Sequence, residues 1–359
     1  MTLATAPEPL AATTLTLHEQ IGFELGWDYA HHRLVPPAPF GQEPSPLSQG
    51  LAAGQAAFGT RTLPASRHVR KWLQLRLHAW LRGRSVELEQ VTPNYLRQID
   101  VSHCPITRVP LSAATLESSD ASVDRVRNDA GYAGGNLAVM STRANLAKAA
   151  CGFRDALAVV ERLERDGATA HEGLGRAEWA RVAVLTSFVT PLPHAEAAAL
   201  PMLVLPPNRL RLFNPVQALQ ALISRQLLAP GWALRITRLE AMLPGKAAKL
   251  GLRLFFQALL PRVLEAAGRG ADPLALRWAV EDAWRHELVR RRWSAFAATL
   301  RPDQCEAVVQ RAARRGLATL RVQALPLPVA TEGWNLASRG YVPHAVLMKR
   351  RVQGLSHPA

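Results

Sequence analysis

Residues 122–148 read SVDRVRNDAGYAGGNLAVMSTRANLAK, and this segment is the most informative part of the chain. Its order predicts a polar strand end, a glycine-rich loop and a helix. Glycines at 131, 134 and 135 favour a tight loop, because glycine adopts positive φ without steric cost. The loop is not a P-loop, since no GKS or GKT follows it. The arrangement would bring an acid, Asp124, near two carboxamides, Asn136 and Asn145.

A second segment lies about twenty residues upstream, HCPITRVPL at 103–111, and is typical of the start of a hairpin. Together the two segments resemble a ββα-metal (HNH-type) nuclease module. The segments are more similar to a phage-type subgroup of that family, which reads CPV-T-x-x-PL, SLDRID, GY-x-x-GN-V and RAN-x-x-K. The residues that conform to it, in order, are Cys104, Pro105, Thr107, Pro110, Leu111, Ser122, Asp124, Arg125, Gly131, Tyr132, Gly135, Asn136, Arg143, Ala144, Asn145 and Lys148.

The resemblance implies a role for each matching position. Asp124 corresponds to the first metal ligand and Asn145 to the ligand on the helix. Asn136 corresponds to the asparagine that orders the loop, and Lys148 to the basic residue one turn later. Such modules hydrolyse phosphodiesters with one divalent ion, so the implied cofactor is Mg²⁺ or Mn²⁺. Zinc-stabilised members carry two CxxC pairs, whereas this chain keeps only Cys104, so no structural zinc is expected.

The chain departs from the family pattern at the general base. Arg125 stands where the family has its catalytic histidine, and a guanidinium stays protonated, so it cannot take a proton from water. It can instead grip a phosphate bidentately. His103 is the best substitute base by residue type, because its pKa suits the task. The alternative is that His103 is a half-exposed strand histidine. The predicted catalytic set is His103, Asp124, Arg125, Asn136 and Asn145.

Asp124 and Asn145 also have a purely structural interpretation. An aspartate at a strand end and an asparagine in a helix can serve as turn and capping groups. Asparagine is a poor residue inside a helix, which favours the site interpretation for Asn145.

Charge is the outlier of the composition. The 359 residues include 43 Lys and Arg against 28 Asp and Glu, a net charge of +15. Such an excess favours nucleic acid or another polyanion as partner, although an arginine-rich composition from high-GC coding gives the same numbers. The predicted nucleic-acid contacts are Arg70, Lys71, Arg76, Arg125, Arg127, Arg143 and Lys148.

Two further basic segments have alternative explanations. Residues 65–83 predict an amphipathic helix with one basic side, which either contacts phosphate or is an ordinary solvated face. In the second, Arg285 and residues 290–292 alternate with Trp284 and Trp293, which suits phosphate contact and base stacking. The favoured alternative there is that the tryptophans face the core and the arginines face solvent.

The predicted fold class is α+β, a small ββα-metal-like module followed by a mainly α-helical domain. The predicted organisation is an extended Pro/Ala-rich lead-in over 1–60 with one short helix near 17–25, a basic helix in 61–85, the module at 86–151, helices at 152–320 and a basic Pro-containing tail at 321–359. Within 152–320 the predicted helices are 153–165, 177–188, 215–228, two over 234–266, one long helix over 273–300, and 303–315, with a loop at 190–196.

The remaining features limit the class of protein. The three cysteines are far apart, which indicates free thiols and, with no leader at the N-terminus, a cytoplasmic location. No apolar run is long enough for a membrane span, so no membrane partner is expected. The leading hypothesis is a DNA-interacting protein with a divergent HNH-like module, which makes it a candidate metal-dependent endonuclease. The alternatives are a catalytically inactive nucleic-acid-binding protein and a helical adaptor that meets a protein partner.

Overall fold

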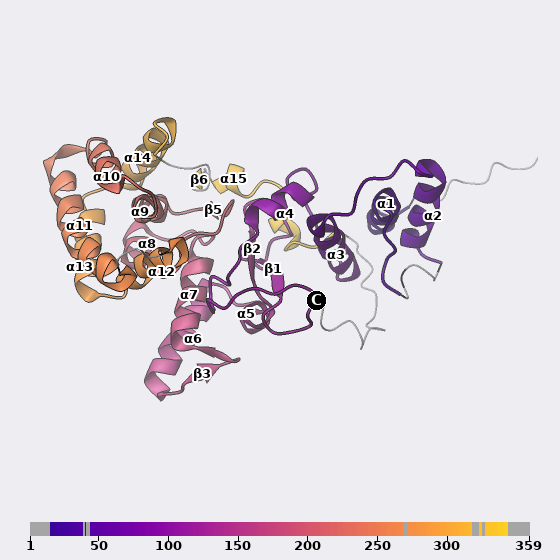
Figure 1. The fold of residues 1–359 in the computed structure, drawn as a ribbon, viewed down its shortest axis with the longest axis horizontal. Helices are drawn as coiled ribbons and strands as arrows, with labels where there is room; N and C mark the ends of the chain where they lie inside the picture. The colour runs from indigo at the N-terminus through magenta and orange to yellow at the C-terminus, as the bar shows by residue number, and fades with distance from the viewer. Residues whose placement is uncertain are drawn as a thin grey trace, which may run out of the picture. The chain divides into compact units, whose positions relative to one another are not determined.

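The computed structural model describes residues 15–38, 40, 44–268, 272–317, 323–324 and 327–343 (Figure 1). The described residues form an α+β fold, in which helices predominate and the strands pair in small two-stranded sheets. The chain divides into two compact units, Met1–Ser85 with Tyr341–Arg351 and Val86–Gly340 with Val352–Ala359.

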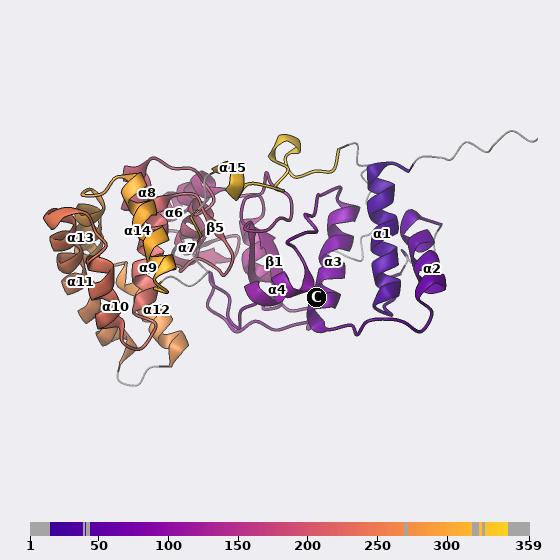
Figure 2. The ribbon, with the colours of Figure 1, turned by 90° about the horizontal axis from the view of Figure 1, so that it is seen from above.

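The first unit contains three helices, α1 (Leu17–His31), α2 (Pro46–Phe58) and α3 (Arg67–Leu81) (Figure 2). Thr16 and Ser45 cap α1 and α2 with capping boxes, and Ser66 caps α3 through its side chain. The short helix predicted near 17–25 lies within α1, whereas the extended chain predicted over the rest of 1–60 is wrong at α2. Proline does not interrupt α2, because Pro46 occupies its first position, where no backbone donor is needed.

Glycines allow α1 and α2 to pack with their backbones in contact. A Cβ added at Gly26 would overlap the carbonyl oxygen of Leu47, and one added at Gly50 would overlap that of Phe23. The sequence prediction missed this pairing because it took the proline content of residues 1–60 as evidence against regular helix.

Replacing Gly26 with alanine is expected to destabilise the first unit by about 1–3 kcal/mol, the usual result of overpacking a close contact. Thermal or urea unfolding would measure the loss. The matched control is Gln55→Ala on the exposed side of α2, which should change the free energy of unfolding by less than about 0.5 kcal/mol. Equal stability of the two variants would contradict the proposed close packing.

The basic helix predicted over 65–83 is confirmed as α3, and Gly83 follows it with a φ of +61°. Its basic side is only partly exposed. Arg70 faces solvent, whereas Arg76 is 4% exposed and forms an ion pair with Asp28. Arg76 therefore contributes to the packing of α3 on α1 and lies outside any exposed basic surface.

The second unit begins with α4 (Pro93–Ile99), and an antiparallel pair follows, β1 (Ala121–Arg125) and β2 (Leu137–Ser141). Their register runs from Ala121 opposite Ser141 to Arg125 opposite Leu137. Helix α5 (Thr142–Lys148) starts directly after β2 with Ser141 as its cap. The upstream segment is a tight turn closed by a bridge between His103 and Pro110.

The rest of the second unit is mainly helical (Figure 1). Its elements are α6 (Phe153–Asp166), β3 (Ala170–His171), β4 (Leu174–Gly175), α7 (Arg176–Ser187), α8 (His194–Ala199), β5 (Arg211–Leu212), α9 (Pro215–Gln226), α10 (Trp232–Glu240), α11 (Gly245–Ala267), α12 (Pro273–Ala283), α13 (Glu287–Ala297), α14 (Pro302–Arg314), β6 (Gln323–Ala324) and α15 (Leu327–Ala330). β3 pairs with β4 antiparallel, and β5 pairs with β6 in parallel.

Most helices predicted beyond 152 are confirmed, with two exceptions. The single helix over 273–300 is wrong, because the chain turns after Trp284 and restarts behind an extended His286. This turn lets Trp284 and Trp293 pack against each other and against Phe255 of α11. The loop predicted at 190–196 contains the start of α8.

One hydrophobic core joins the ββα elements to the helices. It includes Cys104 and Met140 near the sheet and continues through α7, α9 and α11 to α14. Trp334, within the predicted tail, belongs to the same core and donates a hydrogen bond from Nε1 to the carbonyl of Gly134. Residues 86–151 and 152–317 therefore share one core. None of the described helices is long and apolar enough to cross a membrane.

Candidate functional site

The face of β1 that meets α5 carries the predicted metal ligands. Ser122 and Asp124 lie two residues apart and so share one face of the strand. Asn145 and Lys148 lie three residues apart and so share one face of the helix. Asn145 donates from Nδ2 to Ser122 Oγ at 2.7 Å, and Lys148 Nζ lies 3.0 Å from Asp124 Oδ2.

The Asp124–Lys148 ion pair is enclosed by the protein. Asp124 is 4% exposed and Lys148 is fully buried, and the lysine also donates to the carbonyl of Arg125 at 3.0 Å. Burial raises the pKa of Asp124, and the ammonium of Lys148 opposes this effect. The carboxylate that the resemblance assigns to a metal ion thus already has a cation beside it.

This donor set does not fit a divalent ion as it is arranged. Mg²⁺ requires near-octahedral oxygen coordination, and here one buried carboxylate is neutralised by a lysine while the nearby amide bonds a serine. Among the described residues no group of three or more His, Cys, Asp and Glu side chains could hold a metal ion. Metal ligation by Asp124 and Asn145 would require Lys148 to leave the carboxylate.

Asn136 orders the loop between the two strands. It is fully buried, and its Oδ1 accepts from the amide of Arg127 at 2.9 Å. Its Nδ2 donates to the carbonyls of Arg127 and Gly131 at 3.0 and 3.1 Å. One side chain therefore satisfies three backbone groups of a buried loop, as a backbone partner would in regular structure.

Replacing Asn136 with alanine is expected to cost about 1–3 kcal/mol, because these backbone groups lose their partner away from water. Chemical denaturation would measure the change. Asn128→Ala in the same loop is the control and should be milder, since none of its side-chain amide protons is bonded in this structure. An Asn136→Ala variant as stable as the wild type would show that water replaces the amide.

The arginines predicted to bind nucleic acid within this module have protein partners. Arg125 donates to the carbonyls of Asn128 and Ala130 at 3.0 and 2.9 Å, and its guanidinium lies over Tyr132. Arg127 pairs with Asp129. Arg143 forms an ion pair with Glu178 and donates to the carbonyl of Gly173. Lys148 forms an ion pair with Asp124. Lys148 in particular cannot face a phosphate from its buried position.

His103 does not join the other predicted catalytic residues. Its Nδ1 lies 3.0 Å from Ser102 Oγ, and its ring packs edge-on against Trp278. It lines a cavity with Arg225 and Arg277. No hydrogen bond connects it to Asp124 or Asn145, so the structure gives it no role as their base.

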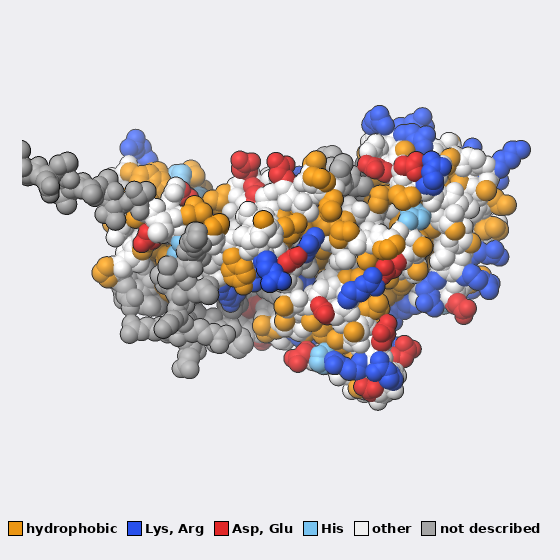
Figure 3. All heavy atoms as spheres, turned by 180° about the vertical axis from the view of Figure 1, so that it is seen from behind, with side chains coloured by type: hydrophobic (Ala, Val, Ile, Leu, Met, Phe, Trp, Pro, Cys, Tyr) orange, Lys and Arg blue, Asp and Glu red, His pale blue; other side chains and the backbone are white. Residues whose placement is uncertain are grey.

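The exposed basic surface lies on the C-terminal helices. Arg290, Arg291 and Arg292 on α13 are exposed, and no described residue forms an ion pair with them. Trp284 and Trp293 are buried, which confirms that the tryptophans face the core. Residues 232–317 hold 16 Lys and Arg against 8 Asp and Glu, a net charge of +8. Figure 3 shows basic side chains gathered over helices α10–α14.

In comparisons with protein-family models, curated proteins and solved structures, the chain matches none. The resemblance to a ββα-metal module therefore stays a prediction from sequence. Two features therefore remain as candidates. One is the buried ion pair between Asp124 and Lys148, and the other is the exposed set of arginines at 290–292 on α13.

Proposed function

We propose that the protein binds DNA by phosphate contacts and does not hydrolyse it, with the ββα elements serving as scaffold. The proposal that it binds DNA rests on the exposed arginines of α13, residues 290–292, which lack carboxylate partners in the described chain. Unpaired guanidinium groups on a surface with a net positive charge attract phosphates and steer a polyanion towards them.

The absence of hydrolysis is supported by the environment of Asp124. Its carboxylate is paired with Lys148 inside the protein, and Arg125 stands at the position of the general base. Neither an open metal site nor a base with a suitable pKa is available in that arrangement. The buried tryptophans favour contacts with the phosphate backbone over stacking on bases.

Salt dependence tests the proposal. Anisotropy of a labelled duplex should give log K falling linearly with log salt, with a slope near −0.9 for each phosphate neutralised. Binding should persist without Mg²⁺ and vary little with sequence. An affinity that does not change with salt, or no binding at low salt, would favour the helical adaptor with a protein partner.

A metal-dependent endonuclease is the second candidate, favoured by the order of the matching residues and by the loop that Asn136 holds. It requires displacement of Lys148 from Asp124 when DNA or metal binds. Plasmid cleavage separates it from the proposal.

A further inference from the structure

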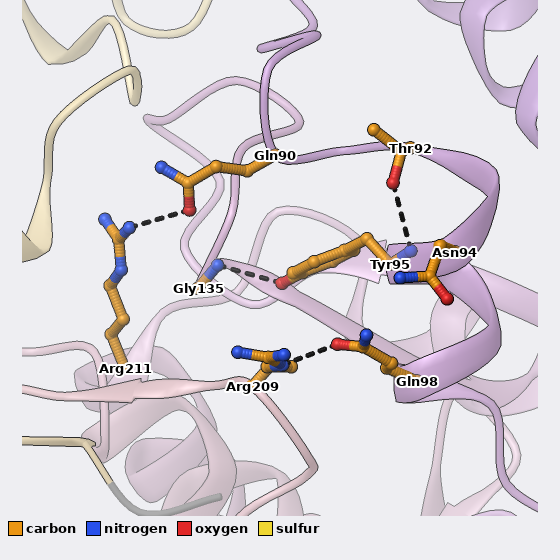
Figure 4. A pocket seen from close by; sticks show the side chains of 8 residues that line it. All are labelled: Gln90, Thr92, Asn94, Tyr95, Gln98, Gly135, Arg209 and Arg211. Carbon is orange, nitrogen blue, oxygen red and sulfur yellow. Dashed lines mark hydrogen bonds between the residues drawn. The ribbon is translucent and has the colours of Figure 1, made fainter. Parts of the chain in front are cut away.

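A cavity of about 240 Å³ lies beside the glycine-rich loop of the second unit (Figure 4). Arg209 and Arg211 enter it from β5 and the segment before it, whereas Asn94, Tyr95 and Gln98 enter from α4. None of these residues belongs to the ion pair at Asp124 or to the exposed arginines of α13.

Arg211 is a buried cation with neutral partners. It is 7% exposed and lies across Gly135, where a Cβ would overlap it and where φ is +85°. Its guanidinium donates to Gln90 Oε1 at 2.9 Å and to the carbonyls of Val329 and Ala330 at 3.2 and 2.6 Å. Burial lowers the pKa of Arg211, because loss of solvent disfavours its charged form.

The nearby acids do not compensate this charge. Tyr95, Glu332 and Glu87 favour the charged form of Arg211, but their combined effect is smaller than that of burial, so its pKa stays lowered. No ion pair of the described residues includes Arg209 or Arg211. Buried charges in proteins are normally paired with an opposite charge, and among the described residues Arg211 has only neutral hydrogen-bond partners.

Arg209 is held in position with its terminal nitrogens unused. Its backbone has a φ of +65°, a conformation that residues with a side chain adopt rarely. Its Nε donates to Gln98 Oε1 at 2.6 Å. Neither Nη atom has a hydrogen-bond partner among the described residues, and Figure 4 shows the guanidinium directed into the cavity.

The other polar groups of the wall present donors. Gln90 and Gln98 accept hydrogen bonds from the two arginines through their amide oxygens. Their NH₂ groups are then available as donors to a ligand. Thr92 Oγ1 accepts from the amide of Tyr95, and the hydroxyl of Tyr95 accepts from the amide of Gly135. Each hydroxyl therefore keeps its proton for a further bond.

We propose that this cavity binds a tetrahedral oxyanion of the phosphate class between Arg209 and Arg211. Such a ligand presents several acceptor oxygens, which matches a wall where the amide oxygens of Gln90 and Gln98 already accept from the arginines. Guanidinium groups bind such oxygens through paired N–H donors. The volume is below the roughly 300–1,000 Å³ of pockets for drug-sized ligands, so it suits one phosphate group. The ligand is either free phosphate or the phosphate of a monoester whose remainder stays in solvent.

Calorimetric titration of the full chain with inorganic phosphate tests this site. Wild type should bind, and Arg209→Ala should weaken binding at least tenfold while leaving the thermal midpoint without phosphate nearly unchanged. Gln98→Leu should also weaken it. No binding up to tens of millimolar phosphate, or equal affinity in wild type and Arg209→Ala, would overturn the proposal.

Two further arms separate the ligand sources and the two proposals. If a deoxynucleoside monophosphate binds more tightly than inorganic phosphate, and the nucleoside without phosphate does not bind, the ligand is a monoester. If the monophosphate and inorganic phosphate bind equally, the ligand is the free ion. The α13 variant Arg290→Ala/Arg291→Ala/Arg292→Ala should bind phosphate like wild type. Loss of phosphate binding in that variant would place the anion on α13 and overturn the cavity assignment.

Discussion

The variant Lys148→Met is expected to lower the free energy of unfolding by about 3–5 kcal/mol, because it leaves the buried carboxylate of Asp124 without its cation. Methionine keeps most of the length and the apolar stem of lysine, so the loss of stability measures the effect of removing the charge. For a unit of this size the thermal midpoint should fall by roughly 6–20 °C, at about 2–4 °C per kcal/mol.

The matched control is the double variant Asp124→Asn/Lys148→Met, which removes both charges. It should recover more than half of the stability lost in Lys148→Met, since breaking one side of a buried pair costs more than removing the pair. A Lys148→Met protein within about 1 kcal/mol of wild type would show that the ion pair is not enclosed as described.

The pH dependence of Lys148→Met follows from the raised pKa of Asp124. A carboxyl with a folded-state pKa above its unfolded value binds its proton more tightly when folded, so stability falls as pH rises through the folded-state pKa. Removing the ammonium raises that pKa further. The stability gap between Lys148→Met and wild type should therefore narrow as pH falls towards the ordinary pKa of aspartate, 3.8.

The second large effect concerns DNA affinity. Replacing Arg290, Arg291 and Arg292 with alanine should reduce the slope of log K against log salt by about 3, roughly one for each arginine that no longer meets a phosphate. Affinity at low salt should fall strongly and equally for unrelated duplexes. Anisotropy titrations at several salt concentrations measure both quantities.

A control with the same change in net charge is available. Arg154, Arg176 and Arg253 are exposed but paired with Glu196, Glu164 and Glu240. Replacing these three with alanine removes the same number of charges from arginines that are already neutralised. If both triple variants lose the same affinity, net charge alone governs binding and α13 is not its location.

Much of the helical region could be predicted because its signals are local. Helix α9 begins with Pro215 behind Asn214, α14 follows Arg301 with Pro302 at its first turn, and α6 shows a clear apolar face. The proline content of residues 1–60 misled the prediction for the first unit. The helix contact that Gly26 and Gly50 allow is not visible in either segment alone.

The site was harder to predict because its decisive contacts are distant in sequence. Asp124 and Lys148 were each placed correctly on a strand and a helix, but nothing local indicates that both would be buried against each other. Lys148 therefore looked like a phosphate contact. The cavity joins Gln90 to Arg211, 121 residues away, and only the bare Gly134–Gly135 pair hinted at a side chain packed over the loop.

Incubation of supercoiled plasmid with the purified protein in Mg²⁺ and in Mn²⁺ tests the central claim most directly, run beside Asp124→Ala and Asn145→Ala. We expect wild type to retard the plasmid on a gel, in a salt-sensitive manner, and to leave it supercoiled with either metal. Nicking by wild type that disappears in both variants would contradict it, and would show that Lys148 leaves Asp124 to admit a metal ion.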